Sequence, residues 1–293
     1  MKFGAQLGAL GLKDRKQELA LAKELGCQGM EVTMPVGDLR TGKTTLDALL
    51  QAAAELRRDF DEAGMEFIAL SPSILLKHAA HPEVIDAVCR VAQVLGTRQI
   101  RMFSAAHVRW GGPGSKLDAW MAEFDGTRDA PYWFKRNAEE LAVLLELTQD
   151  AGLRFVFELH GGFVVNSASG AMRLIDRYAP DRVGILMDPG NMVFEGNEGW
   201  RNSVQIMGPY LSYIHCKNAQ YRREDGRWLH QWAPLDEGVA SFPEIVTALK
   251  DTGFVGYLCI EDLRREVAPT EKIGSGIAYL KRLVASPERV MPV

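Results

Sequence analysis

The chain has 293 residues, a formal net charge of −4 and a hydrophobic content of 47%, which is the composition of a globular protein with a sizeable core. Lysine and arginine are spread along it without a basic stripe, which argues against a nucleic-acid partner. No apolar run is long enough to cross a bilayer. The four cysteines form no C-x-x-C pair, so we expect free thiols in a cytoplasmic protein without a membrane partner.

Strand-like runs alternate with amphipathic helical runs along the first half of the chain. We expect strands at residues 3–7, 29–33, 66–70 and 99–103. Apolar periodicity and the glycines that end it predict helices at residues 13–25, 45–63, 83–95 and 131–151. Residues 105–129 show no clear periodicity and are rich in glycine and tryptophan, which is typical of a functional loop.

The same alternation continues to the end of the chain. We expect strands at residues 155–158, 184–188, 211–215 and 256–261, and helices near residues 168–178, 198–208, 242–251 and 269–284. Eight strand–helix units without a linker predict an α/β protein, a closed (β/α)₈ TIM barrel that forms a single domain over residues 1–293. An open Rossmann-type sheet is disfavoured, because Gly4, Gly8 and Gly11 lack the Gly-x-Gly-x-x-Gly spacing.

Four successive strands end on possible metal ligands: Glu158, Asp188, His215 and Glu261. The C-terminal ends of the strands surround the active site in a TIM barrel. Three carboxylates and one imidazole favour a divalent cation, with Mn²⁺ first and Mg²⁺, Co²⁺ or Zn²⁺ as alternatives. A single such carboxylate is usually a helix cap or a surface charge, and residues 188–191 also fit a turn; four in one regular barrel favour a metal centre.

These strand ends resemble the xylose isomerase-like superfamily of sugar isomerases and epimerases, and the chain is close in length to the ketose 3-epimerases. The resemblance covers essentially the whole chain and is most specific at residues 157–160, 187–191, 214–217 and 260–262, while residues 235–242 resemble the family's Gly-rich loop. It implies that the four strand-end residues bind the metal, that Glu158 and Glu261 also move protons, and that the protein is a homodimer or homotetramer.

Two positions depart from the family pattern. The histidine expected three residues after the strand-six aspartate is Asn191, and the arginine expected six residues after the strand-seven histidine is Tyr221, followed by Arg222 and Arg223. We expect Asn191 and Arg223 to contact the substrate. Residues 220–234 look expanded, and their aromatic side chains are available to line a pocket.

Further polar residues fall near the same strand ends. We expect His160 and Lys217 to contact the substrate, whereas Glu31 fits either a substrate contact or a structural ion pair. Two residues of the long loop could line a lid, His107 and Trp110. Three others fit structural roles, His78 and His81 at a helix entry and Arg101 in a strand.

The predicted site permits proton transfer next to a carbonyl through an enediolate that the metal stabilises. We therefore expect a divalent-metal-dependent sugar isomerase or epimerase acting on a sugar or keto-sugar. The same residues would also serve a dehydratase or lyase acting on a keto-sugar, an inosose or a keto-glycoside. A non-catalytic sugar-binding barrel is a further alternative. A nuclease of the apurinic-site type would need more histidines and a basic surface.

Overall fold

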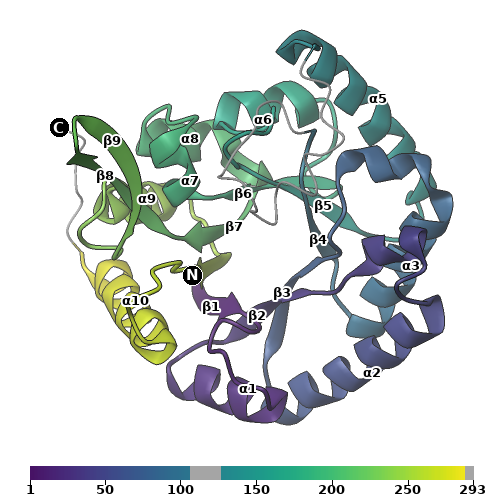
Figure 1. The fold of residues 1–293 in the computed structure, drawn as a ribbon, viewed down its shortest axis with the longest axis horizontal. Coiled ribbons are helices and arrows are strands. Elements are labelled where there is room, and N and C mark those ends of the chain that lie inside the picture. The colour runs from purple at the N-terminus through teal and green to yellow at the C-terminus, as the bar shows by residue number, and fades with distance from the viewer. Residues whose placement is uncertain (106–126, 288–293) are drawn as a thin grey trace.

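Eight parallel strands close into a barrel in the computed structural model, which describes residues 1–105 and 127–287 (Figure 1). Around the barrel the strands follow the order β1-β10-β7-β6-β5-β4-β3-β2. Their bounds are β1 Lys2–Gln6, β2 Gly29–Thr33, β3 Glu66–Ser71, β4 Gln99–Met102, β5 Arg154–Glu158, β6 Val183–Met187, β7 Leu211–Cys216 and β10 Tyr257–Ile260. The predicted TIM-barrel fold is confirmed, and the predicted strands agree with the observed ones to within one or two residues.

The helices surround the barrel, as Figure 1 shows. Their bounds are α1 Arg15–Glu24, α2 Leu46–Ala63, α3 Pro82–Leu95, α5 Ala130–Leu147, α6 Ala168–Ile175, α8 Trp200–Met207, α9 Phe242–Asp251 and α10 Pro269–Ala285. Shorter helical turns are η1 Val36–Thr41, η2 Leu76–Ala80 and η3 Gly208–Tyr210. In the ranges that the structure describes, none of the helices combines the length and the apolarity that a bilayer crossing requires.

Two apolar clusters build the core. The larger one packs the helices against the outer face of the strands. The smaller one consists of strand residues, among them Val156, Leu186, Tyr213 and Cys259. Each of these four residues precedes a predicted metal ligand by two positions. Because side chains alternate along a strand, the ligands point to the same inner side as this cluster, at the C-terminal end of the barrel.

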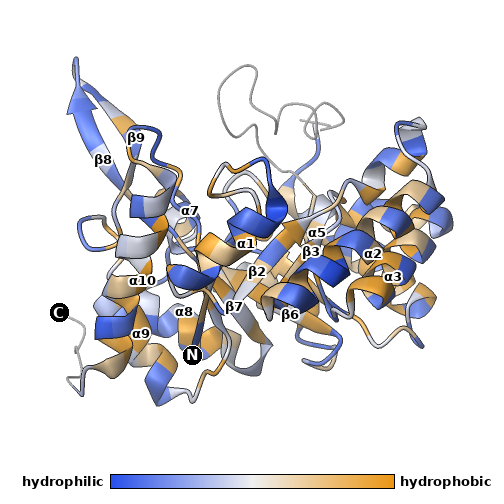
Figure 2. Ribbon diagram, turned by 90° about the horizontal axis from the view of Figure 1, so that it is seen from below, coloured by the Kyte–Doolittle hydropathy of each residue, from blue (hydrophilic) through white to orange (hydrophobic). Residues whose placement is uncertain are grey.

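Besides the short helical turns, the structure adds two elements that the sequence pattern did not predict. Residues 189–194 form a short helix, α7 (Pro189–Phe194), where the sequence fits a turn. An antiparallel hairpin follows β7, formed by β8 (Asn218–Glu224) and β9 (Arg227–Ala233). The hairpin is not part of the barrel sheet, and it projects beyond the body of the molecule (Figure 2).

Candidate metal centre

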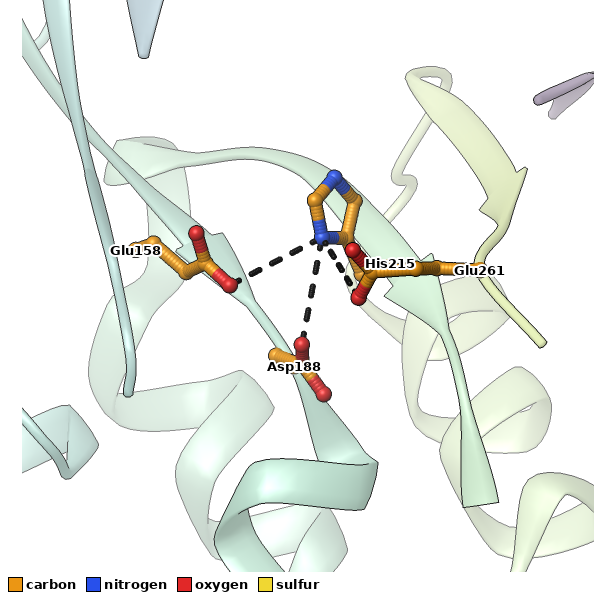
Figure 3. Close-up of side chains that lie close together, drawn as sticks. All are labelled: Glu158, Asp188, His215 and Glu261. Carbon is orange, nitrogen blue, oxygen red and sulfur yellow. Dashed lines mark ion pairs between the residues drawn. The ribbon is translucent and has the colours of Figure 1, made fainter. Parts of the chain in front are cut away.

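Glu158, Asp188, His215 and Glu261 converge at the C-terminal end of the barrel (Figure 3). One ligand atom from each residue lies within 4.8 Å of the others. The Nδ1 atom of His215 faces all three carboxylates, at 3.8 Å from Glu158 Oε1, 3.8 Å from Asp188 Oδ2 and 3.3 Å from Glu261 Oε2. The four residues belong to the adjacent strands β5, β6, β7 and β10 or follow them directly, so strand register brings them together.

Asp188 is positioned by helix α7, which begins directly after it. Its Oδ1 atom accepts a hydrogen bond from the backbone N–H of Asn191 at 3.0 Å, as an N-cap residue does, and Pro189 occupies the first helical position. Capping with Oδ1 leaves Oδ2 directed at His215. The helix also needs Gly190, because a Cβ there would lie 2.6 Å from Cγ of Lys217.

Glu31 on β2 contacts the ring nitrogen of His215 that faces away from the other three candidate ligands. The Nε2 atom of His215 is 2.9 Å from Glu31 Oε2, and the hydroxyl of Tyr213 donates to the same oxygen at 2.6 Å. All three side chains are buried. A carboxylate acceptor at Nε2 holds a proton there, so that Nδ1 is the nitrogen that can bind a metal once it has lost its own proton, as in the carboxylate–histidine–metal arrangement. The structure thus places Glu31 in an ion pair within the site, which was one of its two predicted roles.

Arg101 on β4 links this network to the first ligand. Its Nη1 atom donates to Glu31 Oε1 at 2.8 Å, and its Nε atom donates to Glu158 Oε2 at 2.7 Å. A second bond to Glu158 comes from Nη2. Arg101 was predicted to be structural, and its position beside a ligand was missed. The available signal was an arginine between two apolar residues of a barrel strand, Ile100 and Met102.

Lys217 and Asn191 contact the ligands from the rim side. Lys217 Nζ lies 2.7 Å from Asp188 Oδ2 and 2.6 Å from Glu261 Oε2. The side-chain amide of Asn191 lies 2.9 Å from Asp188 Oδ2 and 3.4 Å from Glu158 Oε1. Asn191 is only 2% exposed, so in this structure it is engaged with the ligands at the position where a substrate contact was predicted.

Buried opposite charges shift the pKa values of the site. Burial alone would raise the pKa of Glu31, but the charges of Arg101 and His215 outweigh it and lower the pKa to about 2. Burial also opposes the shift at His215, whose pKa is nevertheless raised well above its ordinary value by Glu261 and Glu31. The pKa of Glu261 is lowered well below its usual range against the effect of burial, by Lys217 and His215. These directions show that the carboxylates of Glu31 and Glu261 are ionised and are paired with cationic side chains.

The residues present fit a divalent cation. Among the described residues, Nδ1 of His215 has no hydrogen-bond partner although it is fully buried. A buried polar atom without a partner is costly, and metal coordination would satisfy it. Three carboxylates and one imidazole are also a ligand set that Mn²⁺, Mg²⁺, Co²⁺ and Zn²⁺ accept. These observations support the expected metal site.

The sequence singled out other residues as well, among them His78, His81, His107, Trp110, His160 and Arg223. His160 packs edge-on against Phe103 and Phe163, with ring centroids 5.6 and 5.3 Å away. Arg223 lies far out on the exposed hairpin, opposite Trp228. His107 and Trp110 fall outside the residues that the structure describes. His78 and His81 lie at η2 and at the start of α3, which agrees with the predicted helix entry.

Comparison with known families agrees with this architecture. The model of the xylose isomerase-like TIM barrel family matches residues 19–283, which is most of the chain. The chain therefore belongs to this family, and its closed eight-stranded barrel is the fold that the family name describes.

Individual relatives are more distant. The chain is 27% identical over 142 residues to inosose dehydratase 2 of Bacillus cereus, a match that covers 44% of this chain and 46% of that protein. The match thus spans about half the length of the curated relative.

Two solved structures resemble nearly the whole chain. The probable 3-DHS dehydratase AsbF of Bacillus anthracis has a TM-score of 0.69 at 14% identity, covering 96% of this chain and 99% of that one. The 3-keto-D-glucoside 4-epimerase YcjR of E. coli has a TM-score of 0.66 at 19% identity, with the same coverage of both chains. At these identities the likeness shows the fold.

Proposed function

We propose that this protein is a divalent-metal-dependent enzyme that moves a proton next to the carbonyl of a sugar or keto-sugar, so that the substrate is isomerised or epimerised. The observation that carries the proposal is the convergence of Glu158, Asp188 and Glu261 on the Nδ1 atom of His215, which has no hydrogen-bond partner among the described residues. The family membership and the names of the similar proteins, which include an epimerase and dehydratases, support the same class of chemistry.

The strand order gives each glutamate its role in this proposal. Glu158 is the last residue of β5 and Glu261 follows β10, and these are the two outer strands of the β5-β6-β7-β10 arc, so the two glutamates flank Asp188 and His215. Glutamates placed in this way can take a proton from one face of a substrate carbon and return one to the opposite face. Lys217, whose ammonium group lies between Asp188 and Glu261, can hold a substrate oxygen. A bound divalent cation supplies Lewis-acid polarisation of the carbonyl.

A dehydratase or lyase is the second candidate, and the ion pair between Arg101 and Glu158 favours it. Arg101 holds one oxygen of Glu158 with two donors, and the Glu158 side chain is 1% exposed, whereas that of Glu261 is 12% exposed. Glu261 is therefore the more accessible base. Loss of a hydroxyl β to a carbonyl needs only one base to remove the proton, whereas epimerisation through two faces needs both.

The proposal also covers the cation, the compartment and the oligomeric state of the enzyme. We propose Mn²⁺ as the working cation, because hard oxygen ligands dominate the site. We also propose a single catalytic domain that works in the cytoplasm as a homodimer or homotetramer. Metal analysis of the purified protein and light scattering test the cation and the assembly.

Solvent exchange tests the proposed reaction. The protein is stripped of metal, reloaded with Mn²⁺ and incubated in D₂O with ketoses, inososes and 3-keto-glycosides. Metal-dependent deuterium at a carbon next to a carbonyl is the expected result, and it should disappear in Glu261→Gln. Glu66→Gln is the matched control, because Glu66 begins β3 at the opposite end of the barrel.

Each outcome of that experiment has a distinct meaning. Deuterated isomers or epimers support the first candidate. Release of water or of an aglycone, with exchange that survives in Glu158→Gln, supports the second. Tight sugar binding without exchange or release for any compound would reject both and leave a non-catalytic sugar-binding barrel.

A further inference from the structure

The β8–β9 hairpin carries an aromatic cluster beside the metal centre. Phe194, at the end of α7, stacks on His230 with ring centroids 4.1 Å apart and an interplanar angle of 12°. Trp232 and Tyr221 lie 5.4 and 5.7 Å from Phe194. We call Phe194, Tyr221, His230 and Trp232 the hairpin cluster. Three of its four members come from an element that the barrel itself does not need (Figure 2).

Trp232 connects this cluster to the ligands. Nζ of Lys217 lies 5.1 Å from the centre of a Trp232 ring, which is a cation–π distance. The same Nζ atom lies 2.7 Å from Asp188 and 2.6 Å from Glu261. One lysine therefore separates the hairpin cluster from two of the four metal ligands.

A cleft lies on the β9 side of this connection. Its volume is about 550 Å³, and it is lined by His230, Gln231 and Trp232 of β9 and by Leu263, Arg265 and Glu266 of the segment after β10. That segment begins just beyond Glu261. The volume falls within the range of about 300–1,000 Å³ that small-molecule sites occupy.

The lining combines apolar and polar groups. Leu263 is 43% exposed and so presents apolar surface to the cleft. Arg264 also lines the cleft, and its guanidinium group bonds the carboxylate of Asp262 at 2.6–3.0 Å. Gln231, Arg265 and Glu266 can donate to and accept from hydroxyl groups, while Trp232 and Leu263 offer apolar surface to a ring. Such a lining suits a ring that carries hydroxyl groups.

We propose that this cleft is a subsite for the second ring of the substrate, the aryl aglycone or second sugar of a glycoside whose keto-sugar ring lies at the metal centre. The proposal rests on the proposed function and narrows its substrate class to glycosides. Trp232 forms the boundary between the two rings, since it lines the cleft and also contacts Lys217. A free ketose or an inosose would leave the cleft empty.

Binding of unreactive glycosides tests the subsite independently of turnover. The Mn²⁺-loaded protein is titrated calorimetrically with methyl β-D-glucoside, phenyl β-D-glucoside and cellobiose. We expect the phenyl glycoside and cellobiose to bind about tenfold more tightly than the methyl glycoside, because each adds a ring with an aromatic or apolar partner. The advantage should disappear in Leu263→Asp and in His230→Ala, both of which change exposed side chains.

Trp228→Ala is the matched control. Trp228 is an aromatic residue of the same hairpin, it is 66% exposed, and it does not line the cleft. The substitution should leave all three affinities unchanged. Equal affinity for the three glycosides would overturn the subsite, as would an advantage that survives in Leu263→Asp. Tighter binding of glucose 6-phosphate than of phenyl glucoside, lost in Arg265→Met, would overturn it in favour of an anion site.

The outcome can be separated from that of the proposed reaction. Ring-dependent binding without deuterium exchange would reject the reaction and keep the subsite. Exchange with a free ketose combined with equal binding of the three glycosides would keep the reaction and reject the subsite.

Discussion

Replacing Glu31 with glutamine tests how the protein prepares His215 for a metal. Glu31 is 1% exposed and accepts from three donors, at 2.9 Å from His215 Nε2, 2.6 Å from the Tyr213 hydroxyl and 2.8 Å from Arg101 Nη1. Glutamine has the same shape but only one acceptor oxygen, and its amide group would face donors. The variant therefore loses the charge that pairs with Arg101 and at least one of the three hydrogen bonds.

The expected effect on metal affinity follows from the position of Glu31 behind a ligand. Removal of such a partner lowers metal affinity by about 10–100-fold, or roughly 1.4–2.8 kcal/mol at about 1.4 kcal/mol per tenfold. The assay is competition for Mn²⁺ with a fluorescent chelator, at fixed pH, with circular dichroism to establish that the variant is folded. Glu31→Asp keeps the charge but shortens the side chain, so its Mn²⁺ affinity should fall between those of the wild type and Glu31→Gln.

Glu66→Gln is the control for the loss of a carboxylate that accepts from a tyrosine and a cation. Glu66 accepts from the Tyr257 hydroxyl at 2.9 Å and from Lys2 Nζ at 2.6 Å, away from the metal ligands. It should leave Mn²⁺ affinity unchanged. A folded Glu31→Gln protein that binds Mn²⁺ as tightly as the wild type would refute the orienting role of Glu31.

Because the pKa of His215 is raised well above its ordinary value, Mn²⁺ binding near neutral pH should displace a proton from this side chain. Calorimetry would detect the proton as a binding enthalpy that varies with the ionisation enthalpy of the buffer. A binding enthalpy that is the same in all buffers would contradict this prediction. The pKa of Glu31 is lowered from 4.5 to about 2, so its contribution to stability is present above pH 4.5 and is lost as the pH falls toward 2; urea unfolding of Glu31→Gln should depend less on pH in that window than unfolding of the wild type. The buried side chain of Asn218 holds the loop at residues 235–240: it donates to Leu235 O at 2.9 Å and to Ala240 O at 3.0 Å, and it accepts from Ala240 N at 2.9 Å. Asn218→Ala should therefore lower the free energy of unfolding by about 1–3 kcal/mol. An unchanged urea midpoint would show that Asn218 does not stabilise this loop.

Much of the fold was predictable from local sequence patterns. Strand positions were predictable because each barrel strand is a short apolar run between turn residues, and alternation along the strand placed each ligand on the inner side. Glu158, Asp188, His215 and Glu261 could be selected as ligands because each ends such a run, and parallel strands bring their ends to one rim.

Elements with weak local signals were missed. Helix α7 is short, and its sequence fits a turn equally well, so only the cap from Asp188 to Asn191 shows that a helix begins there. The β8–β9 hairpin is exposed along most of its length, and its residues lack the apolar alternation that marks a strand with one buried face.

The sequence by itself determined the barrel and singled out the four candidate ligands, because these depend on residue type and on periodicity along one segment. Only the tertiary structure decided what surrounds the ligands. Glu31, Arg101 and His215 are separated by 70 or more residues, and no local pattern connects β2, β4 and β7. Barrel closure brings these strands together, and it thereby assigns Glu31 to His215, Arg101 to Glu158, and Trp232 to the rim beside Lys217.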